Sequence, residues 1–162
     1  MKAIYKNYFK KNENVSPILK SILNVPIFKN LSNKELKEVL KLTHERHYKK
    51  DEYIFKKMAP SEGMYVIVSG DVKILDPDTG TSFALLRNDD FFGELALLDE
   101  EPRSASAIAQ CPSKLIGFFR TDLLTLIKRS PELGNKILIN LARILGERLR
   151  KTNEELTTSI EN

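Results

Sequence analysis

The spacing of apolar residues changes near residues 46 and 120 and divides the chain into three parts. After Pro17 and Pro26, the spacing of one face of a helix appears at Leu36, Val39, Leu40 and Thr43. Ser32 stands three residues before Glu35, and this capping box predicts a helix over 32–45. Residues 1–16 are polar with scattered aromatic side chains, and we expect an arm or a short helix there.

The middle part, residues 46–120, is typical of a β-rich fold. Short runs of apolar and β-branched residues recur there at steady intervals and are separated by turn residues such as Gly70 and Gly80. The expected strands are 53–55, 64–68, 72–75, 82–86, 106–109 and 114–119. Strands of this length and spacing favour a sandwich or a barrel.

Two helices are expected in the last part. Thr121 is a suitable cap for a short helix over 122–129, and Ser130-Pro131-Glu132 supplies a cap, a first-turn proline and an early acidic residue for a second helix. A stripe of residues spaced by three and four continues this helix to about residue 157, through Leu138, Leu141, Leu145, Leu149, Thr152 and Leu156. So long a helix should extend beyond the β-rich core, and its stripe either folds back over the core or pairs with a second copy of the chain.

Composition is that of an ordinary globular protein, with 41% apolar and 30% charged residues among 162. No apolar run approaches the ~20 residues that a membrane-spanning helix needs. The basic N-terminus lacks the apolar segment of a secretory signal. The single cysteine, Cys111, can form no internal disulfide and excludes zinc and redox motifs built on cysteine pairs. We therefore expect a cytoplasmic protein.

Charge is unevenly distributed along the chain. Residues 1–60 contain 14 of the 26 basic residues and 6 of the 22 acidic ones, a net charge of +8 that leaves −4 for residues 61–162. A basic segment of this kind could contact nucleic acid or an acidic partner. The lysines are scattered rather than clustered, so solvated helix faces are the simpler interpretation.

The segment FFGELALLDEEPRSASAIA, residues 91–109, contains the candidate chemistry. A short helix starting near Gly93 would direct backbone N–H groups toward an anion, and the guanidinium of Arg103 can bind one phosphate through two hydrogen bonds. The carboxylate of Glu94 would repel a phosphate but can accept a hydrogen bond from a ribose hydroxyl. Together these groups suggest a nucleotide site, although Glu94 could merely complement its own helix dipole and Arg103 could lie on the surface. A nucleoside triphosphate is not expected, because the phosphate-binding loop motif GxxxxGK[ST] is absent.

Two parts of this segment, Phe92-Gly93-Glu94-Leu95-Ala96-Leu97 and Pro102-Arg103-Ser104-Ala105, closely resemble the phosphate-binding cassette of cyclic-nucleotide-binding domains. Residues 25–36 and 65–74 resemble other parts of the same family. Residues 141–156 resemble the hinge helix of bacterial transcription factors related to catabolite activator protein. The resemblance covers residues 17–157.

For the fold, the resemblance implies an α+β, mainly β domain over residues 17–162. Its centre would be an antiparallel β-roll, a double-stranded jelly roll, over 46–120. A helical lead over 17–45 and the C-terminal helices over 121–158 would flank this roll.

For the ligand, the resemblance implies cAMP or cGMP, without a cofactor. Glu94 would accept the ribose 2′-hydroxyl beside Gly93, and Arg103 would pair with the cyclic phosphate. Backbone N–H groups in the stretch Leu95-Ala96 and at Ala105 would complete the phosphate cradle, and the Ser104 hydroxyl could reach a phosphate oxygen or the base. For the base, Ile74 and Phe83 are candidates for an apolar wall. Arg148 and Leu149 would form the cap from the long helix, and the arginine could stack on the purine.

Three positions depart from the family pattern, because Asp51, Met58 and Asp89 stand where its members usually have turn glycines. Aspartate tolerates the left-handed backbone of such turns better than most residues, whereas methionine does not. We therefore expect the turn at Met58 to be reshaped.

Neither an enzyme nor a metal site is expected. No nucleophile stands beside a suitable base in the sequence pattern, and His44 and His47, three apart on the expected helix, have no evident third ligand. The sequence ends six residues after Leu156, too soon for a recognition helix, so no DNA-binding domain is expected in this chain. We expect either a stand-alone sensor or a fragment of a larger regulator.

The expected function is a sensor that signals through its C-terminal helix to a protein partner or to a second copy of the chain. The first alternative is a ligand-free interaction module that keeps the fold. The second is a protein that binds DNA through its basic segment.

Overall fold

The computed structural model describes residues 16–160, so the arm or helix expected over 1–16 lies almost wholly outside the described part. Helix α2 spans Pro17–Asn24, the 3-10 turn η1 Pro26–Phe28, and α3 Asn33–Leu40. The strands are β1 His44–Tyr48, β2 Tyr53–Phe55, β3 Gly63–Ser69, β4 Val72–Leu75, β5 Ser82–Leu86, β6 Phe91–Phe92, β7 Ser106–Ala109 and β8 Ser113–Phe119. The 3-10 helix η2 spans Glu94–Leu97, and helices α4 Arg120–Arg129 and α5 Pro131–Ile160 complete the fold.

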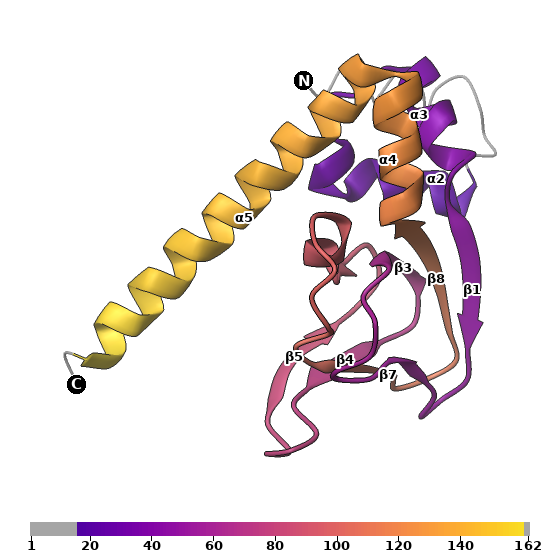
Figure 1. Cartoon of the computed structure of the whole chain (residues 1–162). Helices are drawn as coiled ribbons and strands as arrows, with labels where there is room; N and C mark the ends of the chain where they lie inside the picture. Colours follow the sequence, from indigo (N-terminus) through magenta and orange to yellow (C-terminus); the bar gives the residue numbers. More distant parts are fainter. Residues whose placement is uncertain (1–15, 161–162) are drawn as a thin grey trace.

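The strands form two four-stranded antiparallel sheets, in the orders β1-β8-β3-β6 and β2-β7-β4-β5. Helices cluster at one end of this roll, and α5 runs from that end past the β4–β5 side (Figure 1). The expected antiparallel β-roll, flanked by N-terminal helices and a long C-terminal helix, is thus confirmed.

Strands β3 and β8 lie between two cores, and this position explains their continuous apolar runs. On β8, Leu115 packs into the core between the sheets, whereas Ile116 and Phe118 pack against the helices. On β3, Tyr65 and Ile67 face the core between the sheets. Met64 and Val66 face the core beneath the helices. Successive side chains of a strand point to opposite faces, so a strand that is covered on both sides needs an apolar residue at every position.

The helix expected over 32–45 is wrong at its C-terminal end. The capping box is present, but α3 ends at Leu40, and residues 44–48 form strand β1 beside β8. This strand reads HERHY and is largely exposed, so it lacks the apolar alternation that indicates a strand. His44 and His47 therefore lie three apart on a strand, where their side chains point to opposite faces. His44 contacts Asp122 at 3.0 Å, and His47 contacts Glu45 at 2.7 Å.

The turn at Met58 is not reshaped, contrary to expectation. Met58 has a φ of 66°, and Asp51 and Asp89 have φ values of 65° and 70°, so all three adopt the left-handed backbone that favours glycine. Two hydrogen bonds hold this turn, because the Met58 N–H donates to the Arg103 carbonyl at 2.8 Å and the Arg103 N–H donates to the Ala59 carbonyl at 2.9 Å. The turn therefore fixes the backbone of Arg103.

Replacing Met58 by glycine is expected to raise the free energy of unfolding by about 0.5–1 kcal/mol. A left-handed backbone costs an L-residue about 1–2 kcal/mol, and the greater freedom of glycine in the unfolded chain offsets part of this gain. The Met58 side chain is 70% exposed, so little packing is lost. Urea denaturation measures the change. Asp51→Gly is the control and should gain less, and a loss of stability in Met58→Gly would contradict the expectation.

The first half of α5 contributes side chains to the core, and its second half contributes none among the described residues. Leu133, Ile137, Leu141 and Ile144 are buried, whereas every residue from Glu147 to Ser159 is exposed. Leu149 and Leu156 are 62% and 56% exposed. Within residues 16–160, no helix is long and apolar enough to cross a membrane.

Candidate nucleotide-binding site

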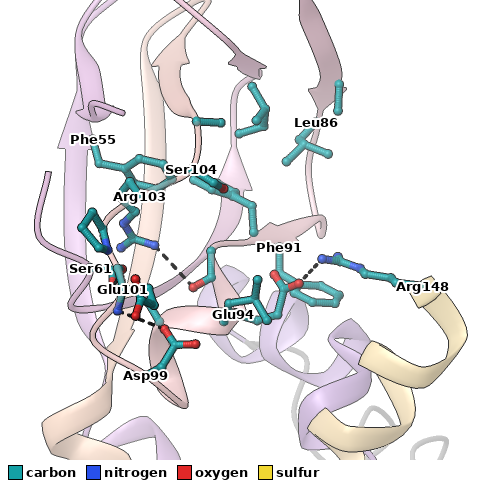
Figure 2. Close-up of a pocket in the computed structure, with 18 residues that line it drawn as sticks. Phe55, Ser61, Leu86, Phe91, Glu94, Asp99, Glu101, Arg103, Ser104 and Arg148 are labelled. Carbon is teal, nitrogen blue, oxygen red and sulfur yellow. Dashed lines mark hydrogen bonds and ion pairs between the residues drawn. The ribbon is translucent and has the colours of Figure 1, made fainter. Parts of the chain in front are cut away.

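A cavity of about 570 Å³ lies between the β-roll and α5. Most of the expected site residues line it, namely Ile74, Gly93, Glu94, Leu95, Ala96, Arg103, Ser104, Ala105 and Arg148. Figure 2 shows Glu94 and Arg103 in separate parts of this cavity, with Arg148 reaching in from α5. The fold thus brings together Ile74 and Arg148, which are 74 positions apart in the sequence.

Arg103 is a buried cation whose partners are carbonyl groups and an aromatic ring. Arg103 follows Pro102 in the loop before β7, and it is 6% exposed. Nη2 donates to the Gly63 carbonyl at 2.6 Å, Nη1 donates to the Gly93 carbonyl at 3.4 Å, and the guanidinium carbon lies 4.0 Å from the centre of the Phe55 ring. Burial lowers the pKa of Arg103.

The Arg103 charge is not balanced within the described residues. No ion pair to Arg103 occurs in that part of the chain, and its buried Nε has no hydrogen-bond partner there. Buried arginines are normally paired with an acid, because burying an isolated charge is unfavourable. The arrangement is suited to an anion that enters the cavity from outside.

Gly93 makes room for the guanidinium of Arg103. Its φ is 76°, a conformation that glycine adopts without strain. A Cβ atom at this position would lie 2.7 Å from Nη1 of Arg103 and 3.3 Å from the Gly63 carbonyl oxygen. Any larger residue would therefore displace the arginine. The short helix expected near Gly93 is η2, a single 3-10 turn in which the Ala96 N–H donates to the Gly93 carbonyl at 3.2 Å.

Glu94 is bound by Arg148 and not by Arg103. The glutamate is 4% exposed, and one of its carboxylate oxygens accepts a hydrogen bond from Nη1 of Arg148 in an ion pair. The Arg148 guanidinium also lies 5.1 Å from the centre of the Phe91 ring. Helix α5 is thereby joined to the first residue of η2.

The apolar wall differs in part from the expected one. Ile74 lines the cavity, but Phe83 does not and is 59% exposed. Ala84 is paired with Ile74 across β4 and β5 and lies on the cavity side, together with Leu86. Phe83 stands at an irregularity in this pairing, and its exposure and absence from the lining show that it points to solvent. Leu149 also lies outside the cavity, because the helix turns it away from the face that carries Arg148.

The sequence pattern did not indicate several of the lining residues, among them Phe55, Ala84, Leu86 and Phe91. The alternation within β5 could have indicated Ala84 and Leu86, had the inward face of the strand been known. Phe55 and Phe91 gave no separate signal, because aromatic residues in short strands are as often core residues.

Residues 45–130 match the family model described as cyclic nucleotide-binding domain. The chain is 36% identical over 134 residues to the cyclic AMP receptor protein of Thermus thermophilus, a match that covers 81% of this chain and 60% of that protein. It is 32% identical over 122 residues to a cGMP-dependent protein kinase of Caenorhabditis elegans, covering 73% of this chain and 15% of the kinase. The chain thus spans less than two thirds of the length of these relatives.

Solved structures agree with this assignment. The catabolite activator protein of Thermus thermophilus is similar with a TM-score of 0.73 at 35% identity, over 83% of this chain and 62% of that one. A cyclic nucleotide-binding domain from Methylobacillus flagellatus is similar with a TM-score of 0.75 at 26% identity, over 94% of this chain and 84% of that one. By the match over residues 45–130 and these likenesses, the chain belongs to the cyclic nucleotide-binding domain family.

Proposed function

We propose that this chain is a non-catalytic sensor that binds cAMP or cGMP in the cavity beside η2. The observation that carries the proposal is the buried guanidinium of Arg103, which has no acidic partner among the described residues and faces a cavity. A cyclic phosphate carries one negative charge and can accept two hydrogen bonds from a guanidinium. Such an anion would balance the charge that the fold leaves unpaired.

We assign each part of the nucleotide to a part of the cavity. The phosphate would lie on Arg103, with backbone N–H groups at Leu95, Ala96 and Ala105 and the hydroxyl of Ser104 around it. The ribose would lie beside Gly93, with its 2′-hydroxyl donating to Glu94. The purine would lie against the apolar wall of Ile74, Ala84 and Leu86. Phe83 and Leu149 have no part in this arrangement, since both lie outside the cavity.

The output would pass through α5. Arg148 attaches this helix to the edge of the cavity, and beyond it the exposed leucines Leu149 and Leu156 present an apolar stripe with nothing of the described chain against it. We propose that a second copy of the chain or a protein partner binds this stripe, and that nucleotide binding changes how α5 lies. A two-state helix of this kind can convert differential ligand affinity into a signal.

Calorimetric titration of the full chain with cAMP and with cGMP tests the proposal. We expect at least one of them to bind with a dissociation constant in the micromolar range or below, since the site combines a charged hydrogen-bond pair with an apolar wall. The comparison of the two nucleotides identifies the preferred base. Absence of binding by both at millimolar concentration would overturn the proposal and favour a ligand-free interaction module. Steep salt dependence in a gel-shift assay would instead support DNA binding.

A further inference from the structure

Arg120, the first residue of α4, contacts the loop that follows η2. Its Nη1 donates to the carbonyl of Ser61 at 3.2 Å, to that of Ala96 at 3.1 Å, and to that of Asp99. Its Nη2 lies 3.3 Å from the carboxylate of Glu100. The Arg120 side chain is 19% exposed, whereas that of Glu100 is 85% exposed, so the partly buried hydrogen bonds to Ser61 and Ala96 are better protected from water than the ion pair.

The three carbonyls belong to residues that line the cavity, and they come from different segments. Ala96 is part of η2, Asp99 lies in the loop after it, and Ser61 lies in the loop between β2 and β3. Ser61 also donates its hydroxyl to the Glu101 carbonyl at 2.6 Å, which ties the two loops together. The backbone N–H of Arg120 donates to the Glu62 carbonyl at 2.8 Å. Both the side chain and the backbone of Arg120 therefore join α4 to the wall of the cavity.

Helix α4 is in turn closely packed against α5. A Cβ atom at Gly134 of α5 would lie 2.6 Å from the side chain of Ile127 and 2.9 Å from its Cα, so only glycine allows this approach of the two helices. Leu123 and Leu126 of α4 are buried in the same core as Leu133 and Ile137 of α5. A displacement of the first turn of α4 would therefore move α5 as well.

We infer that Arg120 is a positioning residue that passes a rearrangement of η2 to α4 and α5. The inference rests on the proposed function and specifies how that site would be coupled to the helices. The N–H of Ala96 donates to the Gly93 carbonyl within η2, and it must turn away from that carbonyl to bind an anion. The Ala96 carbonyl belongs to the next peptide unit, but a 3-10 turn of four residues has few hydrogen bonds to hold its shape, so we expect this carbonyl to change direction when the turn rearranges. Arg120 is bound to that carbonyl and follows it.

A purely structural role is the alternative. In that case Arg120 would hold the loop after η2 in place, and its loss would lower stability and affinity without changing the response of α5 to ligand. The distinguishing measurement is therefore the displacement of α5 at saturating nucleotide. A planar guanidinium with several fixed donors suits a site where three carbonyls converge, and neither glutamine nor lysine reproduces it.

The experiment uses the full chain with Cys111→Ser and spin labels on cysteines at Lys50, in the turn after β1, and at Glu154 on α5, on the opposite face from Leu156. Both positions are exposed. Distance distributions are recorded by double electron–electron resonance without nucleotide and with saturating cAMP or cGMP. The wild-type background should show a ligand-dependent shift. Arg120→Gln should bind about tenfold more weakly, as expected for the loss of hydrogen bonds to partly buried carbonyls, and should show less than half of that shift.

Two variants serve as matched controls. Arg129→Gln removes the same charge from the same helix, but Arg129 contacts Glu38 of α3 and is 63% exposed, so the wild-type shift should persist. Glu100→Gln removes only the exposed ion pair of Arg120 and should also respond as wild type. If Arg120→Gln does not fold, Arg120→Lys replaces it, with a reduced shift expected for the same reason.

The outcomes separate this inference from the function on which it rests. A full shift in the Arg120 variant at saturation overturns the inference alone, and so does a wild-type protein that binds nucleotide without any shift of α5. A wild-type protein that binds neither nucleotide overturns the proposed function and the inference with it.

Discussion

Replacing Arg103 by methionine is expected to weaken nucleotide binding by about 2–4 kcal/mol, which is the usual scale for removing one partner of a buried charged pair. The same substitution should leave the free energy of unfolding of the ligand-free protein within about 1 kcal/mol of wild type, or raise it. Most buried residues contribute to folding, so a loss of binding without a loss of stability would mark Arg103 as a residue kept for its ligand.

The reason lies in the surroundings of the guanidinium. Arg103 is 6% exposed, no described acid pairs with it, and burial lowers its pKa, so the fold alone gains little from its charge. Replacing a buried charge by an apolar side chain of similar length is often neutral or stabilising. Against this, the carbonyls of Gly63 and Gly93 each lose a hydrogen bond, a loss of about 1 kcal/mol apiece. The two effects oppose each other and nearly cancel.

Calorimetry measures the change in the free energy of nucleotide binding. Urea denaturation of the ligand-free protein measures the change in the free energy of unfolding. Arg103→Lys is the matched variant, because it keeps the charge and loses the two-pronged hydrogen bonding. Its affinity should fall between those of wild type and Arg103→Met. Wild-type affinity in Arg103→Met, or a fall in stability as large as that of a truncated core residue, would contradict this account.

The sequence predicted which charged residues line the cavity better than which apolar residues form its walls. Glu94 and Arg103 were expected to act on different ends of a ligand, and the structure places them with different neighbours. Both are recognisable because charged residues within an apolar segment stand out. The base contacts could not be recognised in this way, since β5 reads SFALL and, after Ser82 at its start, has no polar residue to show which face is inward. An irregularity in the pairing of β4 with β5, between Ile74 and Leu75, further shifts the alternation that would place Phe83.

Two other predictions, for strand β1 and for the turn at Met58, were wrong because tertiary contacts decide the local structure there. Strand β1 is an exposed edge made of charged and aromatic residues, so only its pairing with β8 defines it as a strand. Met58 adopts a left-handed backbone because two hydrogen bonds to Arg103 hold the turn, and this outweighs the preference of methionine itself. In both cases distant parts of the chain overrule a local preference that had been read correctly.

A double-mutant cycle on Glu94 and Arg148 is expected to give a coupling energy of about 1–2 kcal/mol in nucleotide binding. Arg148→Gln should weaken binding about 5–30-fold, because it leaves a buried carboxylate without its partner in the same cavity as the proposed phosphate. The lower end of this range reflects the half-exposed arginine, whose ion pair is partly screened by water. In the Glu94→Gln background the same substitution should have little further effect, since no negative charge is left to neutralise.

The sign and size of this coupling decide how the long helix takes part in binding. Arg148 was expected to stack on the purine, whereas its contacts are the Glu94 carboxylate and the Phe91 ring. If the arginine acts directly on the base, its loss costs the same affinity with or without Glu94, and the coupling energy is close to zero. Arg150→Gln, two residues further along the exposed part of α5, is the control and should bind as wild type. A coupling above about 1 kcal/mol would mean that the acid which receives the ribose also holds α5 in place, so that ligand and helix share one carboxylate.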